Sequence, residues 1–237
     1  MQSIESNLVA LNARIAEACR LANRDPASLT LIGVSKTKPL AAVREAAASG
    51  VRHMGENYLD EALAKIDGSR DLDLTWHFIG RIQSNKSRLI AQYFDWVHTV
   101  DRLKIARRLN DQCPPGKRLN TLIQVNIDDD PAKGGIAASL ALELLVQMSA
   151  LPNLQVRGLM AILAQNSDPG ASYQSMAQLF TALRPNLEGD QKLTWDTLSL
   201  GMTADLEQAI DAGATHVRIG TALFGARDRQ TMGAQQT

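Results

Sequence analysis

Residues 29–39 read LTLIGVSKTKP and combine an apolar run with two lysines and a proline. The apolar half predicts a buried strand, because a short apolar run bounded by turn residues is typical of such strands. The basic half places Lys36 and Lys38 at the point where that strand ends. The chain therefore brings ammonium groups to the edge of its own core.

The rest of the chain repeats this alternation of an apolar strand and an amphipathic helix. The predicted strands are residues 29–35, 51–56, 74–80, 95–100, 120–127, 154–162, 197–200 and 215–220. Apolar residues at steps of three and four predict helices between the strands and over the first twenty or so residues. The predicted helices between strands are residues 41–50, 57–66, 84–93, 101–110, 137–150, 172–184 and 204–213.

Eight strands that alternate with helices predict a parallel sheet with right-handed crossovers, and eight strands suffice to close a barrel. We therefore expect an α/β fold, a single (β/α)8 TIM barrel with an extra N-terminal helix. The alternative is an open doubly wound sheet, which usually carries a glycine-rich nucleotide turn that residues 29–39 lack. No linker is evident, so residues 1–237 are expected to form one domain with a polar tail at about 227–237.

The composition is that of an ordinary globular protein, with 45% hydrophobic and 21% charged residues and a formal net charge of zero. This balance gives no indication of a nucleic-acid or membrane partner. No apolar run approaches the roughly 18 residues that span a bilayer, and the N-terminus lacks the apolar block of a signal peptide. Two unpatterned cysteines, Cys19 and Cys113, favour a reducing, cytoplasmic setting.

In such barrels, ligands bind where the strands end. The strand ends are rich in hydrogen-bond donors and poor in carboxylates, which suits a small anionic ligand. No cluster with metal-ligand spacing is present, and Ser199 lies in no G-x-S-x-G elbow, so we expect neither a metal site nor a hydrolase triad. The strand-end residues are Lys36, Lys38, Glu56, Asn57, Gly80, Arg81, Asn126, Met160, Ala161, Ser199, Arg218, Gly220 and Thr221.

The loops after the last two strands usually hold phosphate in these barrels. One follows Ser199 and contains Gly201, and the other contains Gly220 and Thr221. Glycine there lets backbone N–H groups approach a phosphate closely. Each glycine alone could simply turn the chain, but the two motifs together favour phosphate binding.

Lys36 and Lys38 would share one face if the strand extended that far, since residues i and i+2 point to the same side. Both could be solvated loop charges. Alternatively, Lys36 is partly desolvated and close to Arg218, which would lower its pKa and make its amine a nucleophile. An aldehyde that bears a phosphate would match both halves of the site, and pyridoxal 5'-phosphate (PLP) is the obvious candidate.

Four motifs carry a resemblance to the pyridoxal phosphate homeostasis proteins, single-domain barrels similar to the N-terminal domain of alanine racemase. The resemblance runs from about Leu8 to Gly225. Leu200, Thr203 and the loop at 132–135 depart slightly from the usual pattern. The motifs are GVSKTKP (33–39), HMGENYLDEALAK (53–65), WHFIGRIQSNK (76–86) and LSLGMTADLEQAIDAGATHVRIGTALFG (198–225).

The resemblance implies that Lys36 forms the aldimine with PLP and that Arg218 faces the pyridine nitrogen. Asn57 and His77 lie in matching motifs and are expected near the ring. The remaining histidines are expected to be strand residues with satisfied hydrogen bonds. The residues implied to hold the phosphate are Ser199, Gly201, Gly220 and Thr221.

The resemblance further implies a non-catalytic protein that holds, buffers or delivers PLP, with apo forms of PLP-dependent enzymes as potential recipients. A monomer is expected. Two alternatives stay open: a fold-type III PLP enzyme such as an amino-acid racemase, and a barrel that binds another phosphorylated metabolite by salt bridges alone. A racemase needs a tyrosine base, and the tyrosines here, at positions 58, 93 and 173, are predicted to lie in helices.

Overall fold

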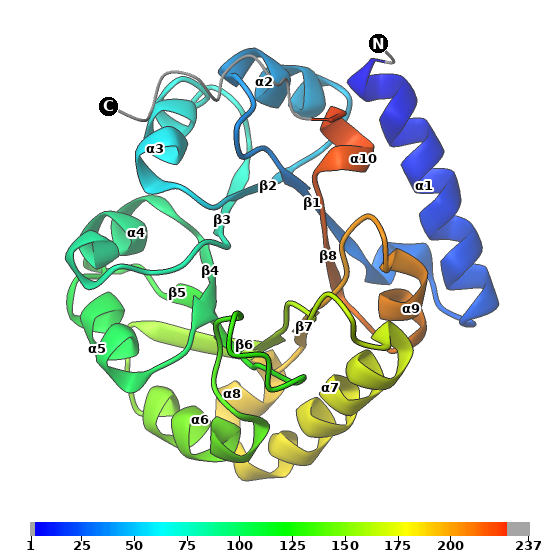
Figure 1. The fold of residues 1–237 in the computed structure, drawn as a ribbon. Coiled ribbons are helices and arrows are strands. Elements are labelled where there is room, and N and C mark those ends of the chain that lie inside the picture. Colours follow the sequence, from blue (N-terminus) through cyan, green and yellow to red (C-terminus); the bar gives the residue numbers. More distant parts are fainter. Residues whose placement is uncertain (1–2, 227–237) are drawn as a thin grey trace.

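A computed structural model describes residues 3–226 of the chain, so the predicted tail at 227–237 lies outside the described residues. Eight parallel strands close into a barrel in chain order, with β1 paired to both β2 and β8 (Figure 1). The predicted (β/α)8 barrel is confirmed and the open sheet is excluded. The strands are β1 (Thr30–Val34), β2 (His53–Glu56), β3 (Thr75–Phe78), β4 (Trp96–Val100), β5 (Leu119–Gln124), β6 (Leu154–Met160), β7 (Thr197–Ser199) and β8 (His216–Ile219).

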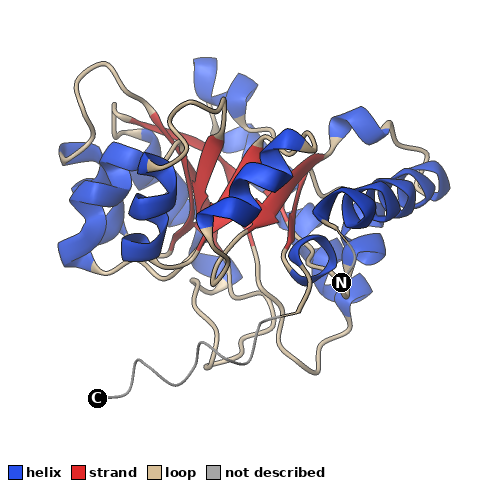
Figure 2. Ribbon diagram, turned by 90° about the horizontal axis from the view of Figure 1, so that it is seen from above, coloured by secondary structure: helices blue, strands red, loops and turns tan. Residues whose placement is uncertain are grey.

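Helices surround the strands (Figure 2). None of the helices in the described residues is long and apolar enough to cross a membrane. Short 3-10 turns lie at Pro26–Ser28, Ser84–Lys86, Ala138–Leu140 and Arg184–Asn186. The α-helices are α1 (Ile4–Leu21), α2 (Leu40–Ala48), α3 (Leu59–Asp67), α4 (Ser87–Tyr93), α5 (Leu103–Asp111), α6 (Ala141–Ser149), α7 (Pro169–Leu183), α8 (Gly189–Thr194), α9 (Leu206–Asp211) and α10 (Thr221–Phe224).

The extra N-terminal helix α1 is confirmed. Ser3 caps it, since its hydroxyl accepts a hydrogen bond from the backbone N–H of Ser6 at 3.1 Å. Its apolar stripe, which includes Leu8, Leu11 and Ile15, is buried in the main hydrophobic core. The helix packs against α9 and α10, and therefore covers the side of the barrel that β8 and β1 form.

Two different environments lie on the two faces of the barrel wall. The large apolar core includes residues such as Met54, Phe78 and Val97, which face the helices. A separate small apolar cluster consists of Trp96, Leu122 and Met160. Buried polar side chains also come from the strands, among them His77, His98, Ser199 and Arg218, and they belong to the site described next.

Candidate ligand-binding site

Lys36 lies at the mouth of the barrel, just beyond the end of β1. Ser35 continues the ladder by one residue, since its N–H donates to the carbonyl of Gly55 at 3.1 Å. The Ser35 side chain is buried and its hydroxyl donates to Glu56 at 2.5 Å, on the side of the sheet that faces α3. Lys36 begins the turn that follows, in which the Lys38 N–H donates to the Ser35 carbonyl at 3.0 Å, and it is half-buried.

Arg218 is a buried cation inside the barrel. It pairs in register with Ile32 of β1, and its side chain is only 4% exposed. Its guanidinium donates to the carbonyl and the hydroxyl of Ser199, both at 2.7 Å, and to the carbonyl of Ala161 at 2.8 Å. Burial lowers the pKa of Arg218, but a guanidinium stays charged in proteins. Three of its five N–H groups are used in this way, which leaves up to two for a ligand.

The loop after β7 is held by a buried tyrosine. Gly201 has a φ of +81° and donates its N–H to the Tyr173 hydroxyl at 3.2 Å. Tyr173 in turn donates to Asp205 at 2.8 Å, and Asp205 accepts the Met202 N–H at 2.6 Å. Burial and then the Asp205 charge raise the pKa of Tyr173, which keeps the phenol neutral. Sequence reasoning placed Tyr173 in a helix, which is confirmed, but missed this supporting role.

The loop after β8 lies beside the loop after β7. The Ala222 N–H approaches the Thr203 hydroxyl at 3.4 Å, which joins the two loops. Gly220 lies against β1, where an added Cβ would meet the Val34 carbonyl at 3.5 Å. Gly201, Gly220 and Thr221 are thus gathered at one mouth of the barrel. Thr203, noted in the sequence only as a departure from the family pattern, is a further hydroxyl in this group.

Ser199 is placed differently from the other predicted phosphate residues. It is fully buried in the barrel, and its hydroxyl is engaged by Arg218 and by His98 at 3.0 Å. The structure therefore gives Ser199 a clear role in holding Arg218. Its direct contact with a phosphate stays a prediction.

Asn57 follows β2 at the same mouth. Its side-chain oxygen is buried and has no hydrogen-bond partner among the described residues. Gly80 allows the loop after β3 to pass close by, since a Cβ there would lie 1.9 Å from the Asn57 carbonyl. Buried polar atoms are nearly always paired, so an orphaned acceptor in this position fits a ligand that donates a hydrogen bond.

His77 lies deeper than expected for a residue that touches a ligand. It is fully buried in the barrel, and its two ring nitrogens meet His53 at 3.0 Å and His98 at 2.9 Å. Burial lowers its pKa well below the ordinary value. The predicted contact of His77 with a cofactor ring stays a prediction.

Lys38 is not equivalent to Lys36. The expectation that both lysines face the pocket required β1 to continue to Lys38, but β1 ends at Val34 and Thr37 has a φ of +63°. The Lys38 ammonium instead donates to the carbonyl of Ala226 at 2.8 Å. The backbone turn at Thr37 therefore separates the directions of the two lysine side chains.

A buried ion pair between Lys65 and Glu56 supports the turn that contains Lys36. The Lys65 ammonium donates to the Ser35 carbonyl at 2.6 Å, to Glu56 at 2.7 Å and to Glu61 at 2.6 Å. Glu61 also accepts the Thr37 N–H at 2.6 Å. Burial raises the pKa of Glu56, and the Lys65 ammonium opposes that shift. Sequence reasoning missed Lys65, although Glu61 and Lys65 stand four residues apart, as ion pairs on a helix do.

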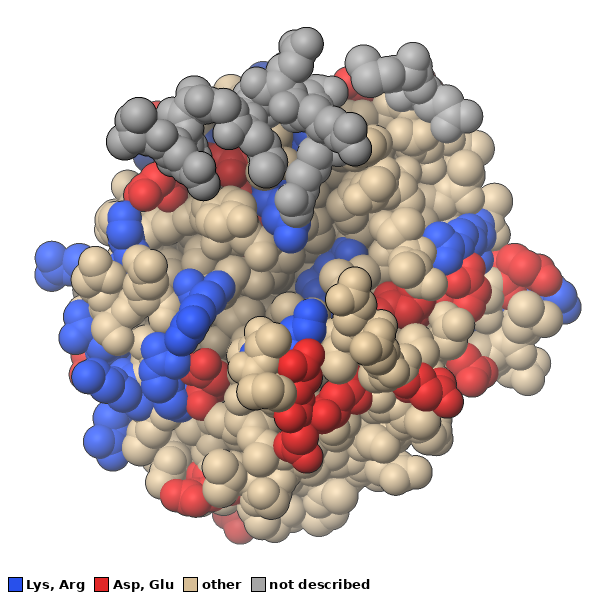
Figure 3. Space-filling model, in the orientation of Figure 1, with Lys and Arg blue, Asp and Glu red and all other residues tan. Residues whose placement is uncertain are grey.

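The charge distribution fits an anionic ligand. The face of the molecule in Figure 3 is hollowed near the barrel axis, and Lys and Arg side chains lie at this hollow. Lys36 and Asn57 follow β1 and β2, Arg218 lies in β8, and Gly201 and Gly220 follow β7 and β8, so all of them lie toward the carboxyl ends of the strands. This set offers an amine, a fixed cation and close-approach backbone, which fits a phosphate-bearing aldehyde such as PLP.

The closed (β/α)8 barrel and the family model below place the chain among the alanine racemase-like barrels. The family model described as "alanine racemase, N-terminal domain" matches residues 6–228.

Two curated relatives cover nearly the whole chain. "Pyridoxal phosphate homeostasis protein" of Pseudomonas aeruginosa is 53% identical over 229 residues, covering 96% of this chain and 97% of its own length. The protein of the same name in Escherichia coli strain K12 is 48% identical over 238 residues, covering 96% and 98%. The chain belongs to the pyridoxal phosphate homeostasis protein family.

Solved structures agree with this assignment. PipY of Synechococcus elongatus, solved with PLP bound, has a TM-score of 0.80 and 35% identity, covering 94% of this chain and all of that one. The alanine racemase of E. faecalis has a TM-score of 0.69 with 15% identity and is covered over 58% of its length. The racemase comparison shows the shared fold alone.

Proposed function

We propose that this protein binds PLP at the barrel mouth and serves PLP homeostasis by buffering or delivering the cofactor. The observation that carries the proposal is that β1 pairs with β8, so that Lys36, which follows the end of β1, and the buried Arg218 of β8 belong to neighbouring strands of the closed barrel. The names of the curated relatives and the PLP-bound PipY structure support it.

We further propose that PLP is held covalently. The Lys36 amine adds to the aldehyde carbon and water leaves, which gives an imine on Lys36. Backbone N–H groups at Gly220 and Thr221 would hold the phosphate, with Ser199 and Arg218 below them. The Gly201 N–H donates to Tyr173, so Gly201 would contribute by shaping the loop after β7. Asn57 and His77 complete the proposed set of binding residues.

The chemistry of Arg218 supports the proposed non-catalytic role but does not by itself exclude catalysis, since alanine racemase shares an arginine at this position of the ring. Because its guanidinium stays protonated, it can only donate to the pyridine nitrogen, which leaves that nitrogen unprotonated and the ring a weaker electron sink. The tyrosines also offer no obvious base: Tyr173 is tied to Asp205, Tyr93 ends α4 and Tyr58 is exposed ahead of α3. The alternative is a fold-type III enzyme such as an amino-acid racemase.

Absorbance spectroscopy tests the binding. Purified protein loaded with PLP should show a visible imine band that borohydride bleaches. A matched pair of variants, Lys36→Ala and Lys38→Ala, separates the two lysines: the first should lose the band and the second should keep it. If added PLP produces no band, the proposed imine is wrong, and the alternative of a barrel that binds another phosphorylated metabolite is favoured.

Two assays distinguish a carrier from an enzyme. Holoprotein incubated with single-enantiomer amino acids should show no α-proton exchange above the background of free PLP. Exchange above that background that Lys36→Ala abolishes would establish the racemase-type alternative. Transfer of PLP to an apo-enzyme faster than release into buffer would favour delivery over storage. We propose a cytoplasmic monomer for both roles.

A further inference from the structure

The protein has four histidines, and all of them lie in the barrel strands. Three of them, His53, His77 and His98, are linked by hydrogen bonds into a row, called the histidine chain below. His53 Nδ1 meets His77 Nε2 at 3.0 Å, and His77 Nδ1 meets His98 Nε2 at 2.9 Å. His98 Nδ1 then meets the Ser199 hydroxyl at 3.0 Å, and the same hydroxyl accepts from Arg218 at 2.7 Å. An unbroken row of contacts therefore joins His53 to the Arg218 guanidinium.

The charge state of the row follows from its burial. His77 and His98 are fully buried, and burial lowers the pKa of each well below its ordinary value. The remaining histidines add to the shift for His77, and Arg218 adds to the shift for His98. These rings are therefore neutral near pH 7, and each has one N–H donor and one acceptor nitrogen.

Arg218 fixes the direction of the hydrogen bonds at one end. A guanidinium can only donate, so the Ser199 oxygen is an acceptor toward Arg218. The single hydrogen of the buried Ser199 hydroxyl then has His98 Nδ1 as its acceptor. If His98 Nδ1 carried a hydrogen and donated to Ser199 instead, the hydroxyl hydrogen would be buried without an acceptor, which is unfavourable.

The direction passes along the chain one ring at a time. If His98 Nδ1 accepts, His98 Nε2 carries the hydrogen and donates to His77 Nδ1. His77 Nε2 then donates to His53 Nδ1, and His53 carries its own hydrogen on Nε2. Each ring is therefore the Nε2–H tautomer, and one donor-only residue determines the order of all three.

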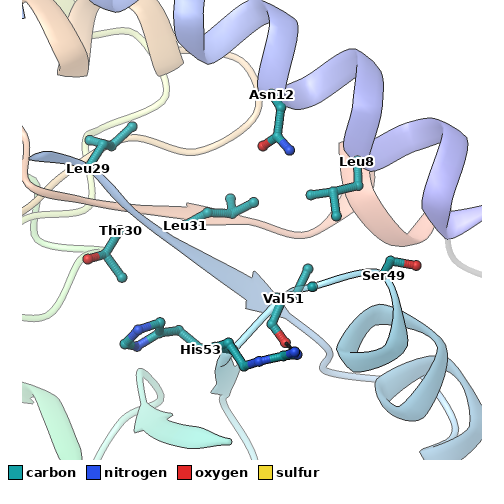
Figure 4. A pocket seen from close by; sticks show the side chains of 10 residues that line it. Leu8, Asn12, Leu29, Thr30, Leu31, Ser49, Val51 and His53 are labelled. Carbon is teal, nitrogen blue, oxygen red and sulfur yellow. Dashed lines mark hydrogen bonds between the residues drawn. The ribbon is translucent and has the colours of Figure 1, made fainter. Parts of the chain in front are cut away.

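The far end of the chain reaches a cavity at the opposite end of the barrel. His53 is the first residue of the parallel strand β2, whereas Ser199 is the last residue of β7. His53 lines a cavity of about 300 Å³ together with Asn12 and Thr30 (Figure 4). Since Nδ1 of His53 meets His77, Nε2 is the ring nitrogen that the row of hydrogen bonds leaves unused.

We propose that His98, His77 and His53 are positioning residues that direct the Ser199 hydroxyl and thereby hold Arg218 for its ligand. The chain also links the cavity beside His53 to the Arg218 site, because a change of tautomer at one end requires a change at the other. The consequence for PLP rests on the proposed function. The order of the hydrogen bonds does not, since it is a property of the ligand-free protein.

Nitrogen NMR of the imidazole rings tests the order directly. Ligand-free protein with ¹⁵N-labelled histidine is recorded at pH 7 in a long-range ¹H–¹⁵N experiment that separates the two tautomers. His53, His77 and His98 should all be neutral Nε2–H rings. The proposal would be overturned if His98 were found as a neutral Nδ1–H ring or as an imidazolium.

A variant in the middle of the chain tests which end sets the order. In His77→Phe, His98 should keep its Nε2–H form because Ser199 still donates to it, whereas the signal of His53 should shift toward a mixture of tautomers. A mixture of tautomers at His98 together with a single tautomer at His53 would show that Arg218 does not fix the order. His216→Phe is the matched control, since His216 bonds Thr215 at 3.0 Å and not the chain, and it should leave the three tautomers unchanged.

The effect on the site is measured separately by PLP titration. His98→Phe should weaken PLP binding about tenfold, which corresponds to about 1.4 kcal/mol, whereas His216→Phe should not. If His98→Phe fails to fold, Ser199→Ala removes the hydroxyl and keeps the ring, and His98 should then lose its uniform tautomer. Unchanged tautomers in Ser199→Ala would contradict the proposal. Wild-type protein that binds no PLP but shows the ordered tautomers would refute the proposed function alone.

Discussion

The Arg218 guanidinium donates to both oxygens of Ser199, the backbone carbonyl and the side-chain hydroxyl, each at 2.7 Å. Both residues are buried, and they come from the neighbouring strands β8 and β7. A side chain with five donors is thus held by two acceptors of one residue, which fixes the plane of the guanidinium. This contact underlies both the proposed ligand site and the order of the histidine chain.

Removing the Ser199 hydroxyl should destabilise the protein measurably. In Ser199→Ala, Arg218 keeps the backbone carbonyl but loses a charged hydrogen bond, so the free energy of unfolding should fall by about 2 kcal/mol. Urea unfolding measures this change. Ser175→Ala, which removes an exposed hydroxyl on α7, should change it by less than about 0.5 kcal/mol. Equal losses in the two variants would contradict a special role for Ser199.

The buried pair of Lys65 and Glu56 should be important for stability. Lys65→Met leaves Glu56 as an unpaired buried carboxylate, so we expect a loss of about 3–5 kcal/mol in urea unfolding. Lys86→Met breaks the more exposed pair with Asp60 and should cost less than about 1 kcal/mol.

The same pair allows a double-variant test. Adding Glu56→Leu to Lys65→Met removes the unpaired charge and should recover part of the lost stability. If the double variant is less stable than either single variant, the cost of Lys65→Met does not come from the stranded carboxylate of Glu56.

Acid should destabilise the barrel through its histidines. Burial lowers the pKa of His216 from 6.5 to about 4, so the unfolded chain takes up a proton first as the pH falls. The stabilising effect of the neutral ring is therefore present above pH 6.5 and is lost as the pH falls toward 4. Between pH 7 and pH 5 the contribution of His216 should fall by about 2 kcal/mol.

Urea unfolding at the two pH values measures this loss. His216→Gln carries no titrating ring, so its stability should fall by about 2 kcal/mol less than that of the wild-type protein over the same pH step. The buried rings of His77 and His98 add a loss of the same sign in both proteins. Parallel losses in the wild type and His216→Gln would mean that the pKa of His216 is not lowered.

Gly80 should be essential for the shape of the site. In Gly80→Ala the new Cβ would overlap the Asn57 carbonyl, so the loop after β2 must move and PLP binding should weaken by at least about tenfold. Gly170→Ala is a suitable control, because Gly170 lies in the first turn of α7 with only the Asp168 side chain near its added Cβ. PLP titration compares them, and equal affinities would show that Asn57 is not needed.

The strands were predictable because each is a separate apolar run. The predicted bounds lie within three residues of the observed ones, as with 120–127 against Leu119–Gln124 for β5. Helix α8 was missed because it has no buried residue and so shows no apolar period, and α10 was missed because four residues make little more than one turn. Their positions depend on the packing of the completed barrel.

The site was predictable where strand ends carry distinctive residues. The closing of β1 on β8 followed from the count of eight strands, and it places Arg218 beside the strand that Lys36 follows. The chain from His53 to Ser199 could not be foreseen, because its members are strand residues whose contacts depend on the register of different strands. Thr37 likewise gave no signal in the sequence of the left-handed turn that separates Lys38 from Lys36.

The central proposal, an imine between PLP and Lys36, is tested most directly by mapping the modified lysine. Holoprotein is reduced with borohydride and digested, and the peptide that carries the pyridoxyl group is identified by mass spectrometry. The account predicts the modification on Lys36, and its loss in Lys36→Ala. A modification found mainly on Lys38 or on any other lysine, with Lys36 unmodified, would contradict it.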